Sequence, residues 1–332
     1  MRKALVAVTV MGLVAGFATA ANATEIKVGG KITTTIASDN GTAYDTSVEA
    51  KVKVDAKVDE NITATVKFLA DDNVNNFTVD GAYVKVKNLF NVPALCASVG
   101  YQDIVIGDSK IVDQTVDSVL LGYNTDFGKL VVGTADGEII GGNFVSRGSS
   151  TTWAVADFKG DLKPFGIGGA FEIADLYQDA MGYNVFYGKV APEFEMDFGK
   201  VGVSAEGAVD ENGNFFGVGA SLDAGMYAVG VSYDMYSDGF ASPFEDYDYA
   251  EYLDNTDFTN PAIITVKAGV KPTDKVELSA AYVNFDGDSA SEDEIDLKAS
   301  YKYTDNLKLS AGLYLPSTGV DYSAEAEIAL SF

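Results

Sequence analysis

The C-terminal segment 321–332 alternates between apolar and polar side chains up to the last residue. The apolar positions are Tyr322, Ala324, Ala326, Ile328, Leu330 and Phe332, and the polar ones include Asp321, Ser323, Glu325, Glu327 and Ser331. A period of two predicts a β-strand that lies between two unlike media. In a sandwich the apolar face would meet a core, whereas in a transmembrane barrel it meets lipid and the polar face meets a wet lumen.

The N-terminus has the anatomy of a secretory signal peptide. Arg2 and Lys3 precede an apolar run over 4–17, and small residues at 18–23 offer cleavage sites. The run is shorter than the ~20 residues that a helix needs to cross a bilayer. We therefore expect a cleaved signal peptide at 1–23 and one domain over 24–332.

Composition excludes several functional classes. The chain is 47% hydrophobic, which is too apolar for disorder, and its 49 acidic against 23 basic residues (net charge −26) argue against a nucleic-acid partner. It has no histidine, which removes the usual base of hydrolytic triads and the commonest ligand of zinc. We expect no enzyme activity, no cofactor and no metal centre. Cys96, the single cysteine, cannot form an intramolecular disulfide.

Period-two segments recur along the whole chain. They predict strands at 25–37, 47–58, 62–68, 77–87, 94–106, 115–124, 128–136, 151–159, 163–174, 182–196, 200–210, 214–224, 225–236, 261–270, 275–286, 294–303, 307–315 and 320–332. Short turns alternate with longer connections at 137–150, 175–182, 237–260 and 286–293. This asymmetry is typical of transmembrane barrels, and lipid requires the sheet to close.

The fold class is therefore all-β, a transmembrane antiparallel β-barrel with an up-and-down meander. About eighteen strands are expected, with sixteen as the alternative. A soluble sandwich is the competing fold, but it predicts large branched residues on the covered faces. Here those faces mix Ala, Gly and Val with Leu and Tyr.

The chain resembles bacterial outer-membrane porins of the general-diffusion, eighteen-stranded kind. The resemblance rests on the N-terminal segment, the strand rhythm and the terminal Phe332, together with the segments 82–86 (AYVKV), 99–103 (VGYQD) and 107–109 (GDS). It implies an outer-membrane location and an assembly signal read by the outer-membrane assembly machinery. That signal would comprise Tyr322, Ile328, Leu330 and Phe332, with Leu330 a departure from the usual aromatic.

Strand parity places charged residues on the inner face of such a barrel. A basic wall is expected from Lys31, Lys51, Lys53, Lys67, Lys85 and Lys298. An acidic wall, with hardly any lysine, is expected opposite from Glu172, Glu206, Asp223 and Asp234. A transverse field between the two would favour charged or dipolar solutes. The alternative is that these are ordinary solvated wall residues, because one bulge reverses the parity.

Two connections are candidates for a constriction. The resemblance implies that the connection at 107–114 folds inward, with Asp108, Lys110 and Asp113. The 137–150 loop, with Glu138 and Arg147, is the alternative. Arg147 is the only arginine after the N-terminal segment, so a ladder of arginines for anionic solutes is absent.

The function expected is ion transport and passive diffusion of small hydrophilic solutes through a water-filled channel, with a modest cation preference. The alternative is a plugged structural or adhesive barrel that acts through acidic external loops. Its acidic 237–260 loop would bind Ca²⁺ or lipopolysaccharide, although a solvated surface loop is the simpler interpretation. The partners expected are outer-membrane lipid and lipopolysaccharide, the assembly machinery, small solutes and ions, and two further copies in a homotrimer.

Overall fold

The computed structural model describes residues 25–39, 45–71, 76–136, 138–140, 143–145, 152–178, 183–211, 213–237, 240, 260–288, 291–317 and 322–332. Nearly all of them lie in strands: β1 (Glu25–Asp39), β2 (Asp45–Lys57), β3 (Ile62–Asp71), β4 (Asn76–Val86), β5 (Leu95–Ile106), β6 (Val112–Asn124), β7 (Gly128–Asp136), β8 (Glu138–Ile140), β9 (Asn143–Val145), β10 (Thr152–Asp161), β11 (Gly168–Gln178), β12 (Tyr183–Met196), β13 (Gly199–Val209), β14 (Asn214–Ala224), β15 (Tyr227–Ser237), β16 (Ala262–Thr273), β17 (Val276–Asp286), β18 (Ser291–Lys302), β19 (Leu307–Pro316) and β20 (Ser323–Ser331). The predicted signal peptide lies outside the described residues.

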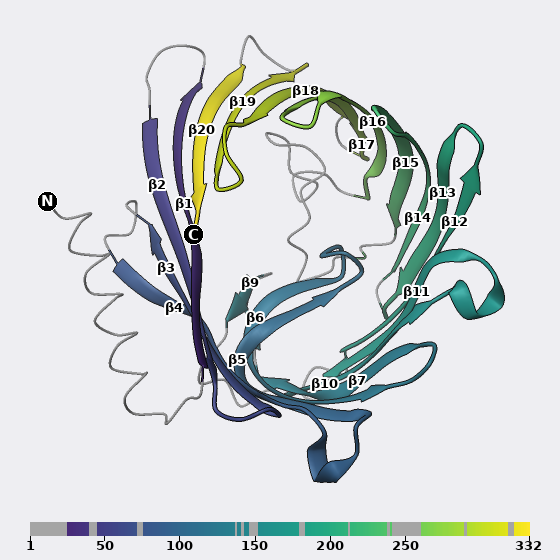
Figure 1. Cartoon of the computed structure of the whole chain (residues 1–332). Coiled ribbons are helices and arrows are strands. Elements are labelled where there is room, and N and C mark those ends of the chain that lie inside the picture. The colour runs from purple at the N-terminus through teal and green to yellow at the C-terminus, as the bar shows by residue number, and fades with distance from the viewer. Residues whose placement is uncertain are drawn as a thin grey trace, which may run out of the picture.

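One sheet of eighteen strands closes on itself. Each wall strand pairs antiparallel with the next along the chain, β7 pairs with β10, and β20 pairs with β1. Figure 1 shows the resulting ring of strands. The predicted all-β meander and its strand count are confirmed. The short strands β8 and β9 form a separate hairpin within the connection from β7 to β10.

The closure of the ring depends on the last residue. Phe332 exchanges two backbone hydrogen bonds of 3.0 Å with Gly30 on β1. A Cβ atom at Gly30 would lie 2.7 Å from the Phe332 ring, so the aromatic side chain lies against the bare backbone of β1. Glycine at this position therefore leaves room for the terminal ring at the seam.

The outer face is a continuous apolar surface. Large hydrophobic side chains that alternate with the lumen-facing residues are between about a third and a half exposed, among them Ile32, Val99, Leu121, Ile173, Val218, Val231, Val266, Leu297 and Ile328. Exposed apolar area on this scale is costly in water and stable in lipid. Together with the closed sheet, it identifies a transmembrane barrel of the outer-membrane type.

The observed strands differ from the predicted ones mainly at one start. The predicted strand 163–174 begins only at Gly168, because Lys163–Phe165 forms a 3-10 turn with a proline at its start. Gly166 ends this turn in the left-handed region (φ 78°). A second 3-10 turn spans Leu89–Asn91. In the described ranges, no helix has the length and apolarity needed to cross a bilayer.

Candidate functional site: an inward-folded hairpin and the lumen walls

The distal parts of β5 and β6 leave the barrel wall. β5 pairs with β4 only as far as Tyr101, and β6 pairs with β7 only from Asp117 onward, so 102–106 and 112–116 pair with each other alone. The departure begins at Gly100, whose φ of 129° favours glycine. In Figure 1 these strands bend into the interior of the ring. We call residues 102–116 the inner hairpin.

One face of the inner hairpin is apolar and fills part of the lumen. Its buried side chains form a single hydrophobic cluster with inward-facing residues of β10–β17, including Ile104, Ile106, Ile111, Val112 and Val116 on the hairpin and Trp153, Val155, Leu176, Val185 and Phe215 on the wall. Burial of each such large side chain contributes about 1.5–3 kcal/mol. Side chains rather than water therefore occupy this side of the barrel.

Lys110 fixes the hairpin tip to the far wall. Its Nζ lies 2.8 Å from Glu206 on β13 and 3.1 Å from Asp234 on β15, and 5.5 Å from the ring centroid of Phe215. Glu206 also accepts a 2.7 Å hydrogen bond from the Tyr187 hydroxyl. All of these groups are buried, and charge-assisted hydrogen bonds are the strong ones in such surroundings.

The rest of the tip is held by wall lysines and a wall carboxylate. Lys189 on β12 donates a hydrogen bond to Asp108, and Glu172 on β11 accepts the Gly107 N–H at 3.3 Å. Lys159 lies 3.1 Å from the same Glu172 carboxylate. Burial alone would raise the pKa of Asp108, but the hydrogen bond and the charge of Lys189 hold it below its usual value.

The predicted acidic wall is on the lumen face, yet most of it contacts the inner hairpin. Glu172, Glu206 and Asp234 are at most 8% exposed. Asp223 is exposed near the short-turn end, where it accepts the Gly225 N–H at 2.9 Å. Whether these four residues act on a permeating solute stays a prediction.

The expectation of hardly any lysine on this side stays a prediction, and the few lysines that it carries stand close to the carboxylates. Lys159 and Lys189 stand on β10 and β12 beside those carboxylates, and they are cross-strand neighbours of Glu172 on either side of β11. Lys189 is likewise the cross-strand neighbour of Glu206. These two lysines were not among the residues predicted from the sequence, although their pairing with Glu172 could have been found from the register.

The six predicted basic residues face the lumen from the other side, on β1–β4 and β18: Lys31, Lys51, Lys53, Lys67, Lys85 and Lys298. We call these six residues the lysine wall. Lys31 and Lys51 are cross-strand neighbours, as are Lys53 and Lys67. Lys67 forms an ion pair with Asp103 on the polar face of the inner hairpin. The hairpin is thus tied to both sides of the barrel.

Of the remaining constriction candidates, Asp113 accepts a 2.6 Å hydrogen bond from the Ser109 hydroxyl close to the tip. Glu138 lies in β8, where only the backbone is described, and Arg147 lies outside the described residues. The connection at 107–114 folds inward, whereas most of the 137–150 loop lies outside the described residues, so its part in a constriction stays a prediction. Most of the 237–260 loop, with the proposed Ca²⁺ site, also lies outside the described residues.

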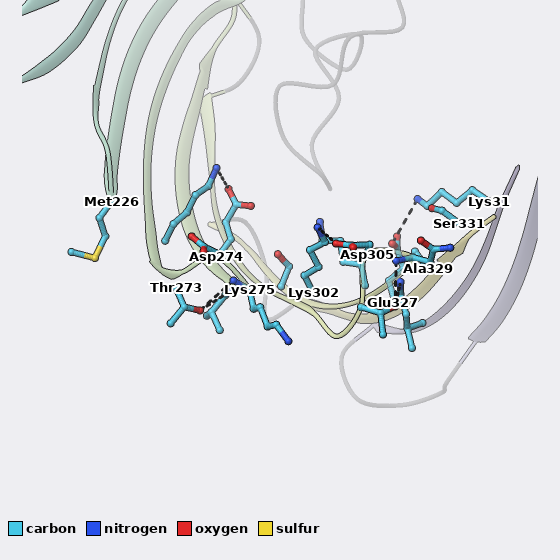
Figure 2. A pocket seen from close by; sticks show the side chains of 18 of the residues that line it. Lys31, Met226, Thr273, Asp274, Lys275, Lys302, Asp305, Glu327, Ala329 and Ser331 are labelled. Atoms are coloured by element: carbon cyan, nitrogen blue, oxygen red, sulfur yellow. Dashed lines mark hydrogen bonds and ion pairs between the residues drawn. The ribbon is translucent and has the colours of Figure 1, made fainter. Parts of the chain in front are cut away.

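A cavity of about 740 Å³ opens at the short-turn end of the barrel. Figure 2 shows its charged lining, with Lys302 paired to Asp305 (2.8 Å) and Lys31 directed toward Glu327 (3.8 Å). Lys275 also lines it, and has no ion-pair partner among the described residues. This end of the lumen is therefore wide and polar. No group of three or more metal-ligating side chains occurs in the described part of the chain.

No protein-family model and no curated protein sequence matches the chain. Solved structures do match. OccAB4 of Acinetobacter baumannii has a TM-score of 0.71 at 11% identity over 94% of this chain and 99% of its own. Pseudomonas aeruginosa OccK2 (OpdF), solved in complex with glucuronate, has a TM-score of 0.70 at 10% identity over 93% and 98%.

The outer membrane protein OprD of Pseudomonas aeruginosa has a TM-score of 0.67 at 9% identity, over 92% of this chain and 94% of that one. The likeness extends over nearly the whole of each chain, although the sequence identity is only 9–11%. The chain therefore has the fold of the eighteen-stranded outer-membrane porins.

Proposed function

We propose that the chain is a porin of the bacterial outer membrane, a channel for passive diffusion of small hydrophilic solutes and ions. One observation supports this above the others: the inner hairpin carries an apolar face toward the filled side of the lumen and Asp103 toward the lysine wall. A barrel built only as a structural element has no need for charged groups on both sides of its interior. Its inward residues set the field that a solute meets.

We propose a modest cation preference. The net charge of −26 attracts cations to the mouths of the channel, and the lysine wall opposes this inside it. The two contributions act in opposite directions, which keeps the preference small. Replacement of lysines in the wall should therefore raise it.

We further propose that the chain is not an enzyme and holds no cofactor. The absence of histidine supports this. The apolar outer face would contact outer-membrane lipid. The acidic 237–260 loop would bind lipopolysaccharide through divalent cations. The assembly machinery would recognise the C-terminal strand. A homotrimer remains part of the proposal.

The test is single-channel recording of the purified mature protein in a planar bilayer with a KCl gradient. The expected result is a stable ohmic conductance. The reversal potential should have the sign of a cation-selective channel and a small magnitude. The double variant Lys51→Gln/Lys53→Gln should shift the reversal potential further toward cations, and Asp103→Asn should shift it toward anions. Asp175→Asn on the outward face of β11 is the matched control and should leave it unchanged.

Absence of any conductance from correctly folded protein would contradict the proposal. That outcome would favour the plugged barrel that acts through its acidic loops.

A further inference from the structure

The lumen face of β13–β16 carries unusually small side chains on the short-turn side of the hairpin tip. Ser204, Gly219, Ser232 and Thr265 form one cross-strand row, and Gly202, Ser221 and Gly230 form the next. Together they line a hollow of about 270 Å³ in the barrel wall. We call these seven residues the hydroxyl trough.

The glycines make the trough deep and bring the hydroxyls to its floor. A Cβ atom at Gly219 would lie 2.8 Å from Ser204 Oγ, and one at Gly202 would lie 2.6 Å from Ser221 Oγ. Each serine hydroxyl therefore leans over the bare backbone of the neighbouring strand. A flat floor edged by hydroxyls is the shape that a small ring can lie on.

Thr265 contributes a buried hydroxyl to the lining of the trough. The residue is 4% exposed, and its Oγ1 has no hydrogen-bond partner among the described residues. A buried hydroxyl is normally hydrogen-bonded, because losing water without gaining a partner is unfavourable. Thr265 stands beside Ser232 at the edge of the hollow, where a bound polar molecule would supply the partner.

The trough itself is uncharged. Glu193, at its β12 end, is neutralised by Lys200 at 2.7 Å, and Lys267 closes the opposite end. One step along β13 and β15 lie Glu206 and Asp234, which hold Lys110. A solute that has passed the hairpin tip therefore meets the trough next.

We propose that the hydroxyl trough is a binding subsite for a neutral polyhydroxylated solute, a sugar or an acyclic polyol. Each serine or threonine hydroxyl can both donate and accept, and so can each hydroxyl of such a solute. Neighbouring positions within a row are one strand spacing apart, about 4.8 Å, so one small molecule reaches hydroxyls on neighbouring strands. The inference rests on the proposed diffusion function, and it specifies a class of solute for it.

The test is block of the K⁺ current through single channels by D-glucose and by sorbitol. The wild-type current should fall with the concentration of either solute and saturate. Thr265→Val, which keeps the shape, and Ser232→Ala should each raise the half-blocking concentration about two- to tenfold, the range expected for one lost hydrogen bond. Ser310→Ala on the lumen face of β19 is the matched control and should leave it unchanged.

Three results would overturn the inference. One is current that glucose and sorbitol do not reduce, and another is block that Thr265→Val and Ser232→Ala leave unaltered. The third is stronger block by gluconate than by glucose that disappears in Lys267→Gln, which would mark the subsite as one for carboxylates. A channel that conducts KCl but fails these tests leaves the proposed function standing. If no current flows at all, calorimetric titration of the folded protein in detergent with D-glucose, in the wild type and Thr265→Val, decides the inference separately.

Discussion

At the scale of single residues, Lys110 is a buried cation held by two carboxylates. Its ammonium group is buried between Glu206 and Asp234, which come from strands remote in the sequence. The sequence identified all three residues as charged groups of the channel interior. It could not pair them, because the pairing depends on how far the hairpin reaches across the barrel.

Loss of the Lys110 charge should release the hairpin tip. Lys110→Met leaves two buried carboxylates without this cation, and breaking a buried pair in this way costs about 3–5 kcal/mol. We expect increased current noise and a larger mean conductance in single-channel recordings, with heat-modifiable gel mobility unchanged because the wall is intact. Lys110→Arg keeps the positive charge and should therefore show the low current noise of the wild type.

The matched control for this change is Lys163→Met, in the exposed turn before β11. Quiet channels of wild-type conductance in Lys110→Met would show that the apolar face and the other polar contacts hold the hairpin without Lys110.

At the scale of elements, the inner hairpin shows what periodicity can and cannot reveal. Its strands were predicted correctly as strands, but their inward bend was not derivable from alternation alone. A signal was nevertheless present. In the wall part of β6 the large apolar residues fall at odd positions such as Val119 and Leu121, whereas in the hairpin they fall at even ones such as Val112 and Val116. A change of phase within one strand indicates that the apolar face has found a new partner.

The docking of the hairpin should persist over a defined pH window. Burial alone would lower the pKa of Lys110, but Glu206 and Asp234 raise it, so its contribution is present below the unfolded value of about 10.4 and is lost as pH rises through the raised one. The depressed pKa of Asp108 means that its contribution is present above about 3.9 and is lost as pH falls through the depressed value.

We therefore expect quiet single channels throughout the range from about pH 4 to about pH 10, and noisy ones once the pH passes the depressed pKa of Asp108 or the raised pKa of Lys110. In Lys110→Met the noise should be present throughout. A wild-type noise level that changes steadily between pH 5 and pH 9 would contradict this account.

At the scale of the whole molecule, the closed sheet was the most predictable feature and the filled lumen the least. Closure follows from local rules, since alternation and lipid together forbid an open edge. The filling of one side depends on contacts between residues far apart, such as Ile106 with the wall of β10–β15. The period of a single strand can indicate that such a contact exists, but it does not identify the distant strands that take part in it.

The seam between β1 and β20 offers a test at this scale. Gly30→Val would press a Cβ atom against the Lys51 carbonyl oxygen on β2 (2.6 Å) and against the Phe332 ring (2.7 Å), and overpacking of this kind costs about 1–3 kcal/mol. We expect a lower unfolding temperature in detergent and a smaller folded fraction by gel mobility. Gly188→Val on β12 is the matched control, because a Cβ there meets nothing within 4 Å. Equal unfolding temperatures for the two variants would contradict a role of Gly30 in the seam.

Because residues 102–116 form ladder bonds only with one another, no hydrogen bond of the surrounding cylinder runs through them. The inner hairpin can therefore become longer or shorter, or change its side chains, without any change in the strand pairing of the wall. The width and the charge of the passage can therefore change while the surrounding cylinder keeps its hydrogen-bond pattern.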